Sequence, residues 1–212
     1  MGENVKRTLN LLAISVVSTV ILWSCGKSAE APAPEAVAAD QDGATDVATD
    51  WADERAAFVA PNGAPIGDVQ FKAAPVDGVM MRIDLTGLAP GWHGVHLHET
   101  GDCSDGADGF KASGGHVNPD GRQHGLLNPD GHERADLPNL YAGADGRATA
   151  EIFAPGLSLS VGAEGPAENG LYNLLDADGF AVVVHENADD HKTQPIGGAG
   201  ARVACAAAIK TE

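Results

Sequence analysis

The stretch GWHGVHLHETGDC, residues 91–103, alternates apolar residues with histidines in the two-residue period of a β-strand. Successive side chains of a strand point to opposite faces, so we expect His96 and His98 to project together and to share one metal ion. His93 stands at odd offsets from both and is expected to face the other way, as a structural residue bonded to a backbone carbonyl. An H-x-H pair alone is weak support for a metal site, so the prediction depends on further candidate ligands elsewhere in the chain.

Similar short apolar runs recur along the chain, filled with Val, Ile and Leu and separated by Asp-Gly and Ala-Pro-Gly turn signals. No long segment carries the apolar stripe of a helix. We predict strands over 66–73, 79–87, 93–99, 148–154, 157–161, 174–177, 180–186 and 201–209. About eight short strands indicate an all-β sandwich or barrel.

Residues 100–147 show hardly any strand pattern. A loop this long inside a compact domain is usually functional or disordered. This one contains Cys103 and three histidines, so we expect it to be functional. The candidate ligands within and beyond it are His116, His124, His132, Asp136, His185 and Asp189. Imidazole suits copper and zinc, and several histidines with one carboxylate suit zinc.

The N-terminus has the layout of an export signal. Lys6 and Arg7 precede an uncharged apolar run of about 17 residues, which is short for a membrane-spanning helix. The run ends in LWSC, which resembles a lipoprotein box and predicts a signal peptide over residues 1–25 with lipid on Cys25. A plain cleaved signal and an uncleaved anchor are the alternatives. Residues 26–52, rich in Ala, Pro and Asp, are predicted to be a disordered tether, which leaves residues 53–212 as one domain.

The chain carries 13 Lys and Arg against 30 Asp and Glu, a formal net charge of −17. This charge argues against nucleic-acid binding and against an anionic membrane surface, so we expect membrane contact only through the N-terminal lipid or signal anchor. Apart from Cys25, the cysteines are an even pair, Cys103 and Cys205. In an oxidising compartment they form either a disulfide or two buried thiols.

Five ordered segments resemble the copper/zinc superoxide dismutase family in its exported bacterial form: GWHGVHLHETGDC, GGHVNPDGRQHG, DLPN, VVVHENADD and GGAGARVAC. The resemblance runs from about Gly63 to Ile209. It implies a Greek-key antiparallel β-sandwich or flattened barrel with long metal-binding loops. It also implies an enzyme that dismutates superoxide on the periplasmic side of a bacterial membrane, with one copper and one zinc per chain.

The resemblance also implies roles for individual residues. His116 matches the histidine that bridges copper to zinc, and with Arg202, beside the copper, it is the implied catalytic residue. Asp189 matches a carboxylate that hydrogen-bonds one ligand of each metal, and Cys103 with Cys205 match the family disulfide. The implied copper ligands are His96, His98, His116 and His185, and the implied zinc ligands include His116, His124 and Asp136.

One position departs from the family pattern. The third zinc histidine normally stands three residues before the aspartate, but Glu133 occupies that place and the histidine is His132. We predict that His132 reaches zinc after a small adjustment of the loop at Gly131, because glycine tolerates unusual backbone angles. Alternatively Glu133 binds zinc, or the zinc site is incomplete. His191 matches no ligand and is predicted to be a surface residue.

Two functions remain in competition. A non-enzymatic copper or zinc carrier on the same fold is the alternative to the enzyme, but such carriers typically lose copper ligands or the arginine. This chain keeps all of them, which favours catalysis with superoxide as substrate. A homodimer and a monomer are both left open as alternatives.

Overall fold

The computed structural model describes residues 51–161 and 170–209. The predicted signal peptide, its lipid site at Cys25 and nearly all of the predicted tether lie outside the described residues. Within the described part of the chain, no helix is long and apolar enough to cross a membrane.

The described residues form β-strands with two short 3-10 helices, Gly106–Asp108 and Lys111–Ser113. The strands are β1 (Glu54–Val59), β2 (Pro65–Ala74), β3 (Gly78–Leu85), β4 (Gly91–His93), β5 (Val95–His98), β6 (Leu140–Ala142), β7 (Ala148–Pro155), β8 (Leu157–Val161), β9 (Tyr172–Leu175), β10 (Phe180–His185) and β11 (Arg202–Ala208).

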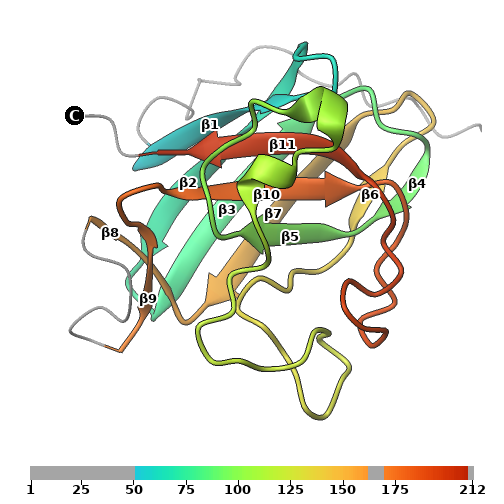
Figure 1. Cartoon of the computed structure of the whole chain (residues 1–212). Coiled ribbons are helices and arrows are strands. Elements are labelled where there is room, and N and C mark those ends of the chain that lie inside the picture. Colours follow the sequence, from blue (N-terminus) through green and yellow to red (C-terminus); the bar gives the residue numbers. More distant parts are fainter. Residues whose placement is uncertain (1–50, 162–169, 210–212) are drawn as a thin grey trace, which may run out of the picture. The chain divides into compact units, whose positions relative to one another are not determined.

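Seven strands form one antiparallel sheet in the order β5-β10-β11-β1-β2-β3-β7 (Figure 1). Strands β3 and β5 lie near opposite ends of this order, so the chain crosses between the two halves as in a Greek key. The sheet curls on itself, because Phe71 of β2 and Phe180 of β10 meet edge to face at 5.0 Å although two strands separate β2 from β10. The predicted all-β antiparallel fold is confirmed, apart from the parallel pair β8–β9.

The core lies inside this curl. Alternate residues of β2 and β3, such as Val69, Phe71 and Met81, are fully buried, as a half-buried strand requires. Strand β10 is buried on both faces. One face joins the main core, and the other packs Ala181 and Val183 against Phe110 of the long loop. This second small core seals the loop onto the sheet.

The strand predictions fail at three places. Strand β6 lies within residues 100–147, where no strand was predicted, because its three residues are too few to show a period. Strand β1 was not predicted, because only Ala56 and Phe58 of its six residues are buried and its apolar alternation is weak. The run predicted over 93–99 is two strands, β4 and β5, which belong to different sheets and separate at Gly94. The Gly94 amide donates to the carbonyl of Asn187, and a Cβ at Gly94 would lie 3.0 Å from that of Ala199, so a larger residue there would crowd Ala199.

The long loop covers the outer edge of β5. The backbone N–H of Val117 donates to the carbonyl of Leu97, and the N–H of Leu97 donates to the carbonyl of Ala135. An exposed strand edge presents unpaired backbone groups, and this loop pairs them. The same pairing places His98 opposite His116 and His96 opposite Asp136.

Candidate metal centre

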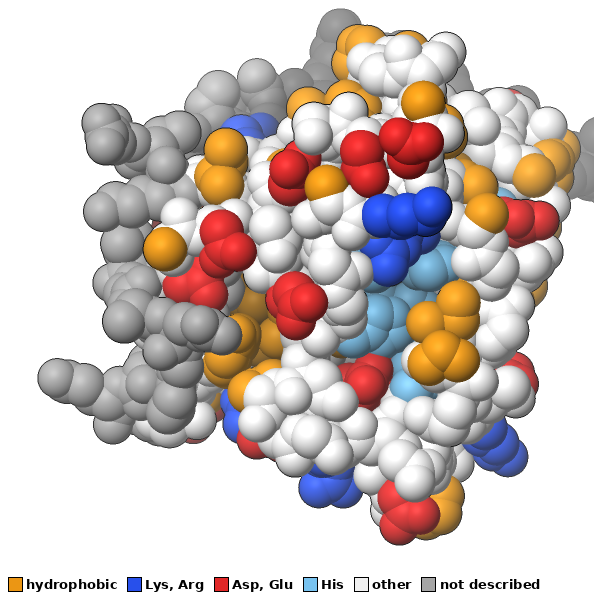
Figure 2. Space-filling view, in the orientation of Figure 1, with side chains coloured by type: hydrophobic (Ala, Val, Ile, Leu, Met, Phe, Trp, Pro, Cys, Tyr) orange, Lys and Arg blue, Asp and Glu red, His pale blue; other side chains and the backbone are white. Residues whose placement is uncertain are grey.

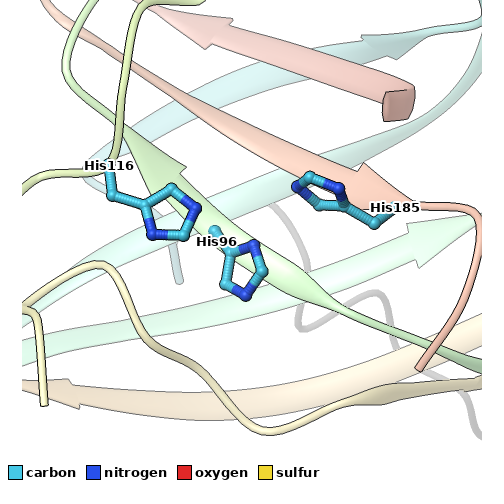
Figure 3. Close-up of side chains that lie close together, drawn as sticks. All are labelled: His96, His116 and His185. Atoms are coloured by element: carbon cyan, nitrogen blue, oxygen red, sulfur yellow. The ribbon is translucent and has the colours of Figure 1, made fainter. Parts of the chain in front are cut away.

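Four histidines meet beside the edge of β5. His96 and His98 come from β5, His185 ends β10, and His116 lies on the loop segment that pairs with β5. The ring centroid of His96 lies 4.4 Å from that of His116 and 4.8 Å from that of His185. Figure 3 shows these three rings gathered from the two strands and the loop. The ring of His98 lies 5.2 Å from that of His116.

Each of these four rings has one bonded and one free nitrogen. Two of the bonded nitrogens face backbone carbonyls: His98 Nδ1 faces that of Gly114 at 3.0 Å, and His185 Nδ1 faces that of Gly200 at 3.1 Å. The other two face carboxylates: His96 Nε2 faces Asp189 Oδ2 at 3.0 Å, and His116 Nδ1 faces Glu133 Oε2 at 2.6 Å. The opposite nitrogens are buried without a hydrogen-bond partner. A proton on the bonded nitrogen leaves a lone pair on the free one, as in metal-ligating histidines.

The charge state of these rings also suits a metal. Burial, and to a smaller extent the positive charge of Arg202, lowers the pKa of His98 to about 2. Burial, and to a smaller extent repulsion from His96, lowers the pKa of His185 to about 3. Burial lowers the pKa of His96 as well. Neutral imidazole is the form that binds a metal ion, so three of the rings are already in the ligating state at neutral pH.

A second group of side chains lies on the other side of His116. His124 Nδ1 lies 2.6 Å from Asp136 Oδ1 and 3.7 Å from Glu133 Oε2. The latter oxygen is also 2.6 Å from His116 Nδ1, which lies 4.0 Å from Asp136 Oδ1. Two imidazole nitrogens and two carboxylate oxygens thus converge, and His124 Nδ1 and Asp136 Oδ1 are buried with no hydrogen-bond partner. Four nitrogen and oxygen donors around one point suit zinc.

Electrostatics in this second group favour a positive charge where the four atoms meet. Burial opposes ionisation of Glu133, but the hydrogen bond to His116 and the nearby ring of His124 outweigh it and lower the pKa of Glu133 to about 2. Burial disfavours a charged His124, yet the nearby carboxylates of Asp136, Asp189 and Glu133 raise the pKa of His124 to about 11. A carboxylate pair that stabilises a proton on His124 also stabilises a bound cation.

Backbone and amide groups fix the two carboxylates. Asp136 Oδ2 accepts from the backbone N–H groups of Gly125 and Glu133 at 2.8 and 2.9 Å. The amide of Asn118 donates to Glu133 Oε1 at 2.9 Å. In both residues one oxygen is therefore held in place while the other points at the histidines.

Asp189 joins the two groups. Its Oδ2 lies 3.0 Å from His96 Nε2, and its Oδ1 lies 3.1 Å from His124 Nε2. Asn139, within the DLPN segment, clamps the backbone of Asp189 by accepting from its N–H and donating to its carbonyl, both at 2.8 Å. Asn139 was not singled out from the sequence, although it stands in one of the segments that carry the resemblance.

The structure places two histidines differently from the predictions. His191 is not a surface residue: its side chain is 17% exposed, and its Nδ1 lies 3.3 Å from Asp189 Oδ2. His132 does not reach the second group, because its ring is exposed and its Nδ1 faces the carbonyl of Glu133 at 2.8 Å. Glu133 takes the place predicted for His132. With Glu133 held by Asp136 and Asn118, the preceding side chain turns outward.

His93 is structural, as predicted. Its Nδ1 lies 2.7 Å from the carbonyl oxygen of His185, and its Nε2 lies 2.8 Å from that of Ala89. The ring is buried at the end of β4, so it braces the strand that carries His185 and has no free nitrogen for a metal.

Arg202 borders the four histidines at the start of β11. Its Nη1 donates to the Phe110 carbonyl at 2.6 Å and to Ser113 Oγ at 3.1 Å, and its Nη2 donates to the Gly114 carbonyl at 2.9 Å. Burial lowers the pKa of Arg202, and the carboxylate of Asp105 partly offsets this. In Figure 2 histidine side chains are visible at the surface, bordered on one side by Lys and Arg side chains.

The disulfide implied by the resemblance is confirmed. Cys103 and Cys205 are bonded, with their Cα atoms 5.8 Å apart, at a sequence separation of 102 residues. The bond ties the start of the long loop to β11, three residues after Arg202. It therefore fixes the loop carbonyls that hold the guanidinium.

Comparisons with known proteins agree with this geometry. A sequence profile described as copper/zinc superoxide dismutase matches residues 66–208. Over 147 residues the chain is 54% identical to the Cu-Zn superoxide dismutase of Caulobacter vibrioides, a match that covers 69% of this chain and 79% of that protein.

Solved structures agree as well. A SOD-like protein from Bacillus subtilis has a TM-score of 0.66 at 37% identity, covering 73% of this chain and 97% of that one. The Cu/Zn superoxide dismutase from Brucella abortus has a TM-score of 0.54 at 30% identity, covering 72% and 97%. The chain therefore belongs to the copper/zinc superoxide dismutase family.

Proposed function

We propose that this protein dismutates superoxide in the periplasm, at a copper ion joined through His116 to a zinc ion. Family membership makes the chain a superoxide dismutase that uses copper and zinc. The observation that carries the finer proposal is the pair of ring nitrogens of His116. Its Nε2 is a free nitrogen of the four-histidine group, and its Nδ1 belongs to the second group.

The proposed copper ligands are the four rings whose opposite nitrogens are bonded to oxygen: His96, His98, His116 and His185. The proposed zinc ligands are His116, His124, Asp136 and, in place of the predicted His132, Glu133. Imidazole-rich sites suit copper, and a mixed imidazole and carboxylate site suits zinc. Asp189 orients one ligand of each metal, since it bonds both His96 and His124.

When bound, copper supplies the one-electron redox change, and zinc has no redox chemistry. In the overall reaction two superoxide ions and two protons become dioxygen and hydrogen peroxide. When Nε2 of His116 is not bound to copper, it can hold a proton and release it to the reduced product, because this buried nitrogen has no other hydrogen-bond partner.

Arg202 is the residue proposed to attract the anionic substrate. The net charge of −17 repels an anion at long range, but charges beyond roughly 8–10 Å are screened at ordinary ionic strength. A half-buried guanidinium beside the histidines therefore sets the local potential.

We also propose that the protein is exported and held by lipid at Cys25 on the periplasmic side of a bacterial membrane. The apolar run that ends in LWSC supports this location, and so does the Cys103–Cys205 disulfide, because disulfides persist in oxidising compartments.

Metal analysis with a superoxide assay tests the proposal. The purified protein should bind one copper and one zinc per chain and remove superoxide in proportion to bound copper. His116→Ala should weaken both metals and abolish most activity, whereas His132→Ala, an exposed matched control, should keep copper and activity. Bound copper without superoxide removal would instead indicate a metal carrier. If His116→Ala leaves zinc affinity unchanged, the bridge is wrong.

A further inference from the structure

Ser113, the last residue of the second 3-10 helix, lies between the substrate arginine and one of the proposed copper ligands. Its side chain is fully buried. Its Oγ lies 2.8 Å from the Phe110 carbonyl, 3.1 Å from Arg202 Nη1 and 3.3 Å from His98 Nδ1. Sequence reasoning missed it, because one serine in a loop carries no periodic or spacing signal.

The direction of each hydrogen bond follows from the capacity of the partners. A hydroxyl has one proton to donate and two lone pairs to accept. A guanidinium only donates, and His98 Nδ1 carries a proton whenever Nε2 keeps its lone pair free for a metal. The Ser113 proton therefore goes to the Phe110 carbonyl, and the two lone pairs receive Arg202 and His98. The hydroxyl is saturated, and its orientation is determined.

The other acceptors around these two donors belong to the backbone. The Gly114 carbonyl accepts from both Arg202 Nη2 and His98 Nδ1, and the Phe110 carbonyl accepts from Arg202 Nη1. Of the three acceptors that bind the guanidinium of Arg202, Ser113 Oγ is thus the one that belongs to a side chain. It is the one contact that a substitution can remove while the backbone carbonyls stay in place.

We propose that Ser113 is a positioning residue, which holds the guanidinium of Arg202 in a fixed place relative to His98 and so to the proposed copper site. This inference rests on the proposed function. Without the hydroxyl, Arg202 loses one of three acceptors, its guanidinium gains rotational freedom, and its charge spends less time where an incoming anion needs it. The proposed copper ligands stay in place, because His98 keeps its bond to Gly114.

A double-mutant cycle of Ser113→Ala and Arg202→Ala tests the proposal. Two quantities are measured on the copper- and zinc-loaded full-length protein: the second-order rate constant for superoxide, per bound copper, and the affinity for azide, from the optical spectrum of the copper. We expect Ser113→Ala alone to lower both by about 5-fold, as for the loss of one hydrogen bond of ordinary net strength, because Arg202 keeps its two backbone acceptors. In the Arg202→Ala background it should lower neither by more than about 1.5-fold, because its effect acts through Arg202.

The matched control is Ser104→Ala, an exposed serine of the same loop, which should change neither quantity. If Ser113→Ala does not fold, Ser113→Cys of similar size, with the Cys103–Cys205 bond verified, should show the same losses, because sulfur is a weak acceptor.

Equal losses in both backgrounds, or no loss in either quantity, would overturn the positioning role. A wild-type protein that binds copper and azide but removes no superoxide would contradict the proposed function instead, and the azide cycle would still test Ser113.

Discussion

Replacing Glu133 by Ala, alongside His132→Ala, is the sharpest test of the second metal site. The two residues are neighbours in the chain but face different surroundings. The Glu133 side chain is 12% exposed, with Oε2 2.6 Å from His116 Nδ1 and Oε1 bonded to Asn118. The ring of His132 is exposed and contacts neither metal-binding group. Only Glu133→Ala removes one of the four donor atoms that meet in the second metal-binding group.

The magnitude follows from the number of donors. Losing a residue that merely supports a metal ligand costs about 10- to 100-fold in affinity, so losing one of four direct donors should weaken zinc binding by at least about 100-fold. That factor corresponds to about 2.8 kcal/mol. With free zinc at about 100 times the wild-type Kd, bound zinc stabilises the wild type by about 2.7 kcal/mol and the variant by only about 0.4 kcal/mol.

The difference of about 2.3 kcal/mol should lower the melting temperature of Glu133→Ala by about 5–9 °C at that free zinc concentration. His132→Ala should stay within about 2 °C of the wild type, because an exposed substitution changes stability by less than about 0.5 kcal/mol. Competition with a zinc chelator and calorimetric melting measure both quantities, with copper content as the control. Zinc loss in His132→Ala but not in Glu133→Ala would refute the assignment. Unchanged zinc affinity in both variants would mean that neither residue binds the metal.

Three further outcomes are expected. Replacing both disulfide cysteines by Ser should lower the stability by up to about 4.7 kcal/mol and the melting temperature by about 10–20 °C, since the bond closes a loop of 102 residues; an unchanged melting curve would contradict this. The metal-free protein should lose stability as pH falls from 6.5 towards 3, by up to about 1.4 kcal/mol per pH unit for each of His98 and His185. Their folded-state pKa values, about 2 and about 3, lie below the unfolded value of about 6.5, so only the unfolded chain takes up these protons; urea unfolding that is equally stable at pH 6.5 and 5 would refute this. Cys25→Ser should move the protein from the membrane fraction to the soluble periplasmic fraction, and a wild type that is already soluble would refute lipidation.

Much of the fold followed from local patterns. Runs such as 66–73 and 79–87 became β2 and β3, because a period of two residues places apolar side chains on one face wherever the strand lies. The same parity put both His96 and His98 beside His116. Strand β1 escaped prediction because it buries little apolar surface and depends on its neighbours β2 and β11.

For the candidate site, too, the sequence determined one part and the tertiary structure decided the other. The sequence by itself determined which residues can bind metal on the strands, through their parity, and which segments carry the family pattern. It did not determine the inward residue of the pair His132 and Glu133, since a loop has no period that assigns faces. Only the tertiary structure decided it: the backbone N–H of Glu133 bonds Asp136 and its carboxylate bonds Asn118, so the glutamate is held inward and His132 turns to solvent. Ser113 and Asn139 acquire their roles for the same reason, because their partners Arg202 and Asp189 lie 89 and 50 residues away along the chain, and only folding brings them within hydrogen-bond distance.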